Sequence, residues 1–273
     1  MSDCPVCGAV GSQPVWAEGA FVARRCDHCS VVHVTPGADG GRGEIFSEDY
    51  YRKNYIAFED VRLDYAQKLV ARVLDLLRSS SRTRRVLEVG CGPGYYLRAF
   101  QAAGWDVVGV EPAPFARRYA HDRFGIEVYA ALEEVPRDEL GLVTFFDVLA
   151  HVPEPFSLLR SAVGRLAADG SVAVKTPCHS AAMFAALRLV SKVTETRGLL
   201  HVPSQICHFD AGSLRNLIRA VGFEEVKCAA IRELFLPVRW RDNAQVALYT
   251  RGLKWSGLFG MLPSMLAIGR TRT

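Results

Sequence analysis

The stretch VLEVGCGPGYYL, residues 86–97, joins a short apolar run to a helix-like segment through a bend rich in glycine. Glycine adopts backbone angles closed to other residues, and the N–H groups at the start of the following helix would point at a ligand over the bend. A dinucleotide-binding bend has the spacing G-x-G-x-x-G, whose third glycine would fall where this chain has Tyr95. The spacing here is G-x-G-x-G, preceded by Glu88 two positions upstream, and it disfavours pyrophosphate binding.

Apolar strand-like runs alternate with helix-like segments on the C-terminal side of this bend. Strands are expected at residues 86–89, 107–110, 126–129, 142–146 and 171–175, from residue 223 onward, and at 261–268. Helices are expected at residues 47–77, 95–103, 114–124, 155–166 and 210–221. This alternation predicts an α/β fold with a doubly wound, mostly parallel sheet.

Glu111 ends the second of these strands, 21 residues after Gly90. A carboxylate at this place in a doubly wound sheet accepts hydrogen bonds from both hydroxyls of a ribose. Together with the bend, it indicates a nucleoside ligand without a bound pyrophosphate.

Four of the eight cysteines lie within the first 29 residues, as two C-x-x-C pairs: Cys4, Cys7, Cys26 and Cys29. The 18 residues between the pairs are enough for a hairpin that brings the four thiolates around one structural Zn²⁺. We expect residues 1–45 to form a zinc ribbon and a glycine-rich linker, with the metal supplying much of the folding free energy. Four reduced cysteines or two disulfides are the alternatives.

Charge bears on the partners of this ribbon. The whole chain has a formal charge of +4, but residues 1–45 hold three arginines against five acidic residues, a net charge of −2. Four thiolates around Zn²⁺ add a further net charge of −2. A nucleic-acid clamp requires positive charge. We therefore expect a small-molecule acceptor and no nucleic-acid partner.

Composition, the length of the apolar runs and the first residues bear on the class of protein and its compartment. Hydrophobic residues make up 49% of the chain and charged residues 23%, which excludes disordered, collagen-like and coiled-coil classes. No apolar run reaches the ~18 to 20 residues needed for a membrane span, and the first residues lack the layout of a signal peptide. We expect a cytoplasmic protein.

Five motifs in this order resemble the class I S-adenosylmethionine-dependent methyltransferases. They are VLEVGCGPGYYL at residues 86–97, VVGVEPAP at 107–114, FFDVLAHVPEP at 145–155, DGSVAVKTP at 169–177 and CHFDAGSLRNLIRAVGF at 207–223. The resemblance implies a seven-stranded Rossmann-like sheet over residues 46–273. The N-terminal zinc ribbon and the tyrosines at positions 50, 51 and 55 resemble the branch that methylates sugars and other small metabolites.

The resemblance also implies roles for single residues. The bend would lie against the methionine and ribose of the cofactor, Glu111 would bind the ribose hydroxyls, and Glu88 would orient the bend or the cofactor amine. Phe146 would border the methionine and Leu132 the adenine, although both are equally suited to core packing. The full cofactor-binding set implied is Glu88, Gly90, Cys91, Gly92, Gly94, Glu111, Leu132 and Phe146.

Three positions depart from the family pattern, all on the substrate side. Gly141 stands at the start of the fourth strand, where Asp is usual. Ala150 precedes His151 where Glu is common, and Gln205 replaces a frequent His. These departures bear on specificity more than on the cofactor.

Two histidines are candidates for catalysis. His151 follows the fourth strand, at the edge of the sheet where ligands bind, and it is our first choice of general base or acceptor-orienting group. His208 precedes a helix cap beside a loop that could cover the acceptor. Backbone hydrogen bonding is the alternative role for each. We expect residues 178–205 to form a lid, in which the apolar stretch 181–193 could also form a homodimer or membrane-surface face.

The sequence leads us to expect an enzyme that methylates an oxygen or nitrogen of a small metabolite, a sugar or a secondary-metabolite intermediate. An rRNA or tRNA methyltransferase that uses the ribbon for RNA is one alternative. A cofactor-binding regulator without catalysis is another.

Overall fold

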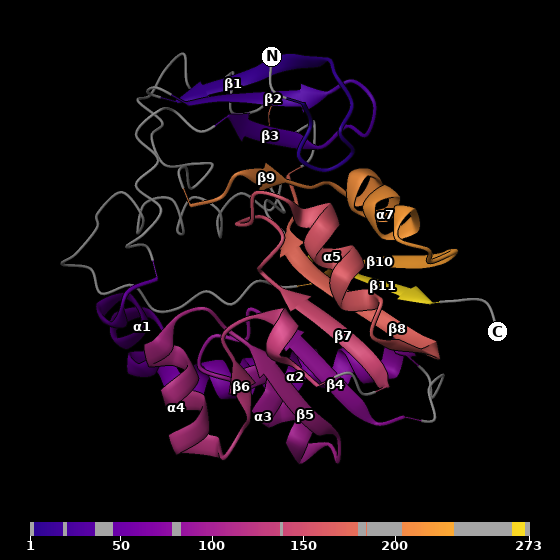
Figure 1. Ribbon diagram of the computed structural model, residues 1–273. Helices are drawn as coiled ribbons and strands as arrows, with labels where there is room; N and C mark the ends of the chain where they lie inside the picture. The colour runs from indigo at the N-terminus through magenta and orange to yellow at the C-terminus, as the bar shows by residue number, and fades with distance from the viewer. Residues whose placement is uncertain are drawn as a thin grey trace.

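Two sheets make up the strand architecture of the computed structural model, which describes residues 3–18, 21–35, 46–77, 83–136, 139–179, 184, 204–231 and 264–270. One sheet has seven strands in the order β10-β11-β8-β7-β4-β5-β6, and the other has four in the order β1-β2-β3-β9. The four-stranded sheet lies over one end of the larger one (Figure 1).

The seven-stranded sheet confirms the predicted fold class. Its strands are β4 (Arg85–Val89), β5 (Asp106–Val110), β6 (Val128–Tyr129), β7 (Leu140–Phe146), β8 (Leu166–Pro177), β10 (Glu225–Ile231) and β11 (Ser264–Arg270). The neighbours from β8 to β6 pair in parallel, and β11 runs antiparallel to both β8 and β10. Strand β11 overlaps the strand expected at residues 261–268 and continues to Arg270.

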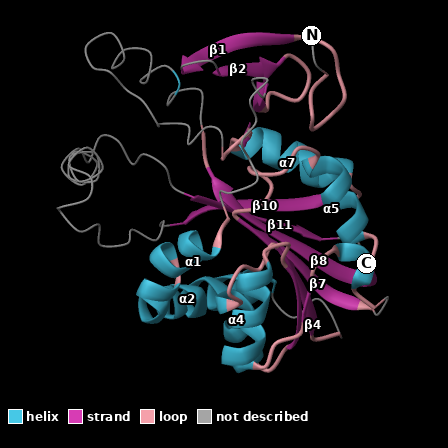
Figure 2. Cartoon of the chain, turned by 60° about the vertical axis from the view of Figure 1, so that its left-hand side comes forward, coloured by secondary structure: helices cyan, strands magenta, loops and turns pink. Residues whose placement is uncertain are grey.

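Helices cover both faces of this sheet (Figure 2). They are α2 (Glu59–Leu77), α3 (Tyr95–Ala102), α4 (Pro114–Phe124), α5 (Pro155–Val163) and α7 (Ala211–Ala220). Strand β4 shows why two layers form, because successive side chains of a strand point to opposite faces. Val86 packs in the cluster that contains buried residues of α2 and α3, whereas Leu87 and Val89 pack in the cluster that contains those of α5 and α7.

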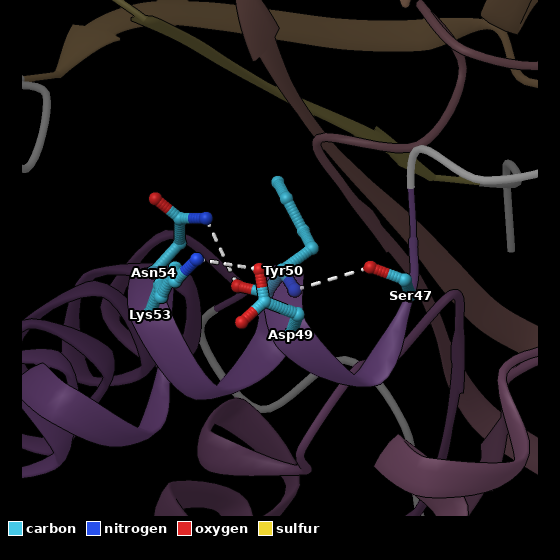
Figure 3. Close-up of polar contacts among 5 residues, drawn as sticks. All are labelled: Ser47, Asp49, Tyr50, Lys53 and Asn54. Atoms are coloured by element: carbon cyan, nitrogen blue, oxygen red, sulfur yellow. Dashed lines mark hydrogen bonds and ion pairs between the residues drawn. The ribbon is translucent and has the colours of Figure 1, made fainter.

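The helix expected at residues 47–77 is two helices, α1 (Glu48–Asn54) and α2, joined by a 3₁₀ turn at Ile56–Phe58. Ser47 caps α1 by accepting a hydrogen bond from the backbone N–H of Tyr50, as Figure 3 shows. Asn54 ends α1, and its carbonyl accepts a hydrogen bond from Nε of Arg62 on α2 at 2.8 Å. This tertiary contact satisfies a terminal carbonyl and fixes the break, which periodicity alone could not predict.

Strand β8 begins earlier than expected and includes the Asp169–Gly170 turn. Its pairing with β7 jumps from Leu140 opposite Leu166 to Leu142 opposite Ser171, so the turn residues form an irregularity inside the strand. The same irregularity lies at Gly141, the first of the three departures from the family pattern.

The four-stranded sheet consists of β1 (Ser12–Glu18), β2 (Phe21–Cys26), β3 (Val32–Thr35) and β9 (Cys207–His208). Strands β1 and β2 form the hairpin expected between the cysteine pairs. Strand β9 comes from the C-terminal half of the chain and pairs antiparallel with β3. The domain boundary near residue 45 stays a prediction, and most of the expected lid, residues 178–205, lies outside the described residues.

Within the described ranges, no helix combines the length and the apolar character that a membrane crossing requires.

Candidate functional site

The two cysteine pairs occupy matching turns. In the first turn, the backbone N–H of Gly8 donates to the carbonyl of Cys4 at 2.8 Å, and in the second, that of Ser30 donates to Cys26 at 3.1 Å. Gly8 and Ser30 both have positive φ, 69° and 64°. The two turns thus have the same backbone hydrogen bond and a positive-φ residue directly after their second cysteine.

The four sulfurs form one cluster. The ligand atoms of Cys4, Cys7, Cys26 and Cys29 all lie within 4.8 Å of one another. The Sγ atoms of Cys4 and Cys29, and those of Cys7 and Cys26, are 3.6 Å apart. A disulfide would need about 2.05 Å, whereas zinc–sulfur bonds of about 2.3 Å in a tetrahedron place the sulfurs about 3.8 Å apart. The arrangement fits a Cys4 zinc site.

A pocket of about 460 Å³ opens at the carboxyl ends of β4, β5 and β7. This volume lies in the range of about 300–1,000 Å³ typical of small-molecule sites. Seven of the residues expected to bind cofactor or to act in catalysis line it: Glu88, Gly90, Cys91, Gly92, Glu111, Phe146 and His151.

The glycines of the bend have backbone angles that other residues rarely adopt. Gly90 has φ 71°, Gly92 has φ 52° and Gly94 has φ 83°. A Cβ on Gly90 would lie 2.5 Å from Cγ2 of Val148, which is too close for any side chain. A Cβ on Gly92 would project into the pocket region toward Tyr51, 3.7 Å away. Gly90 and Gly92 leave room for a ligand because neither has a side chain.

The carboxylate of Glu111 is buried and joins the bend to the next helix. Oε2 accepts a hydrogen bond from the backbone N–H of Gly92 at 2.9 Å, and Oε1 accepts from that of Ala113 at 2.9 Å and from the Tyr51 hydroxyl at 3.2 Å. Burial raises the pKa of Glu111, and the two N–H donors oppose that rise. The carboxylate is therefore held in place beside the glycines, where a ribose would bind.

Glu88 lies beneath the same bend, 1% exposed. Its Oε2 has no hydrogen-bond partner among the described residues. Burial, followed by the nearby charge of Glu111, raises the pKa of Glu88 well above its usual range. A buried carboxylate oxygen without a donor is costly, and a ligand that brings an ammonium or hydroxyl group would satisfy it.

These observations test the expected cofactor against the pocket. Two buried carboxylates beside the glycines would repel a pyrophosphate, and they suit a cationic ligand that carries hydroxyl groups. S-adenosylmethionine has an ammonium group, a sulfonium and ribose hydroxyls, and the residues present fit it.

His151 lines the same pocket as Glu111. Its Nδ1 lies 2.7 Å from the backbone carbonyl of Ser204. A carbonyl only accepts, so Nδ1 carries the proton and Nε2 is the basic nitrogen of the neutral ring. The ring of Phe46 packs edge-on against it, with centroids 5.9 Å apart.

The structure does not bring three of the expected residues to this pocket. Gly94 caps α3 and packs toward Ala120, and Leu132 is buried in the core. His208 lies on β9, 1% exposed, with its ring 4.5 Å from the ring of His179. None of the three is among the described residues that line the pocket.

Sequence reasoning missed two polar residues here. Asp147 lines the pocket directly after β7 with φ 61°, an unusual angle for a residue other than glycine. It pairs with Lys175, which is 1% exposed at the end of β8. The signal available in the sequence was an acidic residue at the carboxyl end of one strand and a lysine inside the apolar run of the next.

Comparison with known proteins gives a family. Residues 59–227 match the family described as Methyltransferase domain. The chain is 29% identical over 180 residues to the tRNA U34 carboxymethyltransferase of Azotobacter vinelandii, a match that covers 62% of this chain and 53% of that protein. It is 33% identical over 129 residues to the ubiquinone biosynthesis O-methyltransferase of Bordetella avium, covering 44% and 50%. The chain spans about half the length of these curated relatives.

Solved structures support the fold. A chain in the complex between the Haloferax volcanii Trm112 methyltransferase activator and a methyltransferase superposes with a TM-score of 0.58 at 14% identity, covering 82% of this chain and 97% of that one. At this identity the likeness shows the fold alone.

The expectation that the charge of the ribbon argues against a nucleic-acid partner is wrong. Several relatives, including the Azotobacter vinelandii protein, are named for tRNA. The error came from judging the acceptor by the charge of residues 1–45, although the pocket lies in the remainder of the chain, which carries the compensating positive charge.

Cys4→Ser should abolish stoichiometric zinc binding, because a tetrahedral site loses one of its four thiolates. Elemental analysis of the purified protein should find one zinc ion per chain in the wild type and much less in the variant. Cys228→Ser, outside the cluster, is the matched control and should keep its zinc. A wild-type protein without zinc would contradict the assignment.

Glu111→Ala should weaken binding of S-adenosylmethionine by about 1 to 3 kcal/mol, because the ribose hydroxyls lose a charged acceptor. Titration calorimetry would record this loss as an affinity about 5- to 150-fold lower. Glu133→Ala, which removes an exposed carboxylate, should bind as the wild type does. Equal affinities of the two variants would refute the role of Glu111.

Glu88→Gln should stabilise the cofactor-free protein increasingly as the pH rises. Because burial raises the pKa of Glu88 in the folded state, the folded chain binds this proton more tightly than the unfolded chain, and wild-type stability falls as pH rises through that raised pKa. Urea unfolding should show that the free energy of unfolding of the variant, relative to that of the wild type, increases between about pH 5 and 8. Glu133→Gln should show no such trend, and a pH-independent difference for Glu88→Gln would contradict the prediction.

Proposed function

The chain belongs to the methyltransferase-domain family, and from that premise we propose that it is an S-adenosylmethionine-dependent enzyme that methylates an oxygen or nitrogen of a small metabolite. A sugar or a secondary-metabolite intermediate is the acceptor class. The observation that carries the proposal is that one pocket holds both the cofactor-side carboxylate Glu111 and His151 with a defined basic nitrogen.

Bound S-adenosylmethionine supplies a methyl group activated by the positive charge of its sulfonium. The protein's task is then mainly alignment, and a correctly held acceptor gains a large proximity effect. Glu111 would bind the ribose hydroxyls in place of the Tyr51 hydroxyl, and Glu88 would accept from the ammonium group. Phe146 lies in the same wall of the pocket and would border the methionine portion.

His151 would act on the acceptor. With its Nδ1 proton donated to the carbonyl of Ser204, the ring presents Nε2 as its proton acceptor. A hydroxyl group gains most from such a base, because its oxygen becomes a stronger nucleophile as the proton leaves. This geometry favours an oxygen acceptor over a neutral amine.

The residues around His151 suit a small organic acceptor. Phe46, Tyr55 and Val148 line the same pocket, and the guanidinium of Arg62 stacks on the Tyr55 ring at 3.9 Å. Asp147, paired with Lys175, adds a carboxylate that can accept hydrogen bonds from hydroxyls. Aromatic walls with a few polar groups are typical of sites that orient a small ligand.

A tRNA acceptor is the second candidate, favoured by relatives named for tRNA and by a groove beside the pocket. This groove, about 370 Å³, runs between α1 and α4, and three arginines, two aromatic residues and two acidic residues line it: Arg52, Arg118, Arg123, Phe115, Tyr119, Glu48 and Asp122. Arginine and aromatic side chains together bind phosphates and stack on bases. Two of the arginines are paired with acidic residues, which weakens the charge available to a phosphate.

Methyl-labelled S-adenosylmethionine tests both candidates in one experiment. The protein is incubated with the labelled cofactor and, separately, with a metabolite extract or with total tRNA, and the labelled product is identified. Label in an O-methylated or N-methylated metabolite supports the first proposal, and label confined to tRNA overturns it in favour of the second.

His151→Ala should lower turnover by about 10²- to 10⁴-fold while cofactor affinity stays within experimental error, because the base acts on the acceptor alone. Turnover is measured with the identified acceptor and affinity by calorimetry. His121→Ala removes an exposed histidine of α4 and is the matched control. Wild-type turnover in His151→Ala would assign that residue a structural role.

A further inference from the structure

Residues 204–207 lie between the cysteine-rich sheet and the catalytic pocket. On one side, β9 pairs with β3, with Cys207 opposite His33, and the backbone N–H of Val34 donates to the carbonyl of Ile206 at 2.9 Å. This short segment therefore extends the cysteine-rich sheet, in which β2 ends at Cys26 and β3 begins three residues after Cys29.

The same segment holds the turn that carries His151. The backbone N–H groups of Ile206 and Cys207 both donate to the carbonyl of Ala150, at 2.8 and 3.1 Å. The carbonyl of Ser204 accepts from Nδ1 of His151 at 2.7 Å. Ala150 and His151, two consecutive residues of the pocket turn, are thus bonded to Ser204, Ile206 and Cys207, and the cysteine-rich sheet holds the last two of these from the other side.

Packing reinforces these hydrogen bonds. The metal-ligand cysteines Cys4, Cys26 and Cys29 belong to the same continuous apolar cluster as Leu149 and Ile206. Ile206 is 7% exposed and Leu149 is completely buried. Because close-packed cores transmit displacement rather than absorb it, loss of order at the cysteines would reach the pocket turn.

We propose that the zinc-ligand cluster positions His151 through residues 204–207, fixing the ring by its hydrogen bond to the Ser204 carbonyl. The inference rests on the proposed function, since it gives His151 a task on the acceptor. Ser204 is a positioning residue, because it acts through the histidine. Groups that orient a catalytic imidazole set which nitrogen carries the proton, and their loss costs activity without removing the base itself.

The test reads the tautomer of His151 directly. Protein labelled with ¹⁵N in its histidine rings is studied by NMR at a pH where the neutral ring predominates, with His151→Ala used to assign the signals. In the zinc-loaded wild type, His151 should be a single Nδ1–H tautomer. Removing zinc with a chelator should convert it to a tautomer mixture, and adding zinc back should restore it.

Two variants separate the proposed path from general unfolding. Cys7→Ser changes the exposed member of the cluster, and Ile206→Ala loosens the connecting segment while leaving all four cysteines. Both should give the mixed tautomer and a turnover at least about 10-fold lower, with cofactor affinity within about 2-fold of wild type, since Glu111 and the bend are untouched. Cys228→Ser should match the wild type, and exposed His121 should show the same tautomers in every sample.

A His151 ring that stays a single Nδ1–H tautomer after zinc removal and in Ile206→Ala overturns the proposal, whatever happens to turnover. Failure of the proposed function looks different. In that case His151→Ala would retain wild-type turnover, while the tautomer of His151 would still respond to zinc.

Discussion

The hydrogen bond between Glu111 Oε2 and the backbone N–H of Gly92 joins the ends of two adjacent parallel strands. The glycine bend follows β4 and Glu111 follows β5, and the register places the two strand ends side by side, with Val89 opposite Val110. Because Glu111 also accepts from Ala113 at the start of α4, one carboxylate holds the bend, the strand end and the next helix together. The cofactor pocket exists because this buried group is fixed from three directions.

The same arrangement makes the cofactor-free pocket electrostatically unfavourable. Glu88 and Glu111 are both buried, and burial raises the pKa of each. Burying carboxylates costs stability that the fold must recover through its core on both faces of the sheet. A cationic, hydroxyl-rich ligand would offset that cost, so the residues that weaken the free protein are those expected to select the cofactor. This opposition between stability and binding is common at functional sites.

Local patterns in the sequence predicted the features that depend on local geometry. The glycine bend, Glu111 at its strand end and the paired cysteine turns follow from spacing, because a parallel sheet brings successive strand ends to one edge. The break between α1 and α2 depends on Arg62 reaching the carbonyl of Asn54, and β9 exists because β3 pairs with it. Long-range contacts of this kind leave no periodic signal. For the same reason, the neighbouring loop suggested a position over the acceptor for His208, whereas the structure places this residue on β9, outside the described residues that line the pocket.

The N-terminal cysteines belong to the main core, and this bears on whether the ribbon or the larger sheet determines which acceptor binds. If the ribbon bound the acceptor independently of the rest of the chain, its own charge would determine which acceptors bind. Its net negative charge would then disfavour nucleic acid. Three of its cysteines, Cys4, Cys26 and Cys29, instead belong to the same apolar cluster as Leu149. Leu149 directly precedes Ala150 and His151 of the pocket turn. Under the proposals above, acceptor choice would depend on the pocket and on the groove beside it. The charge of the ribbon would then carry little information about the substrate, whereas its integrity would bear on the pocket turn.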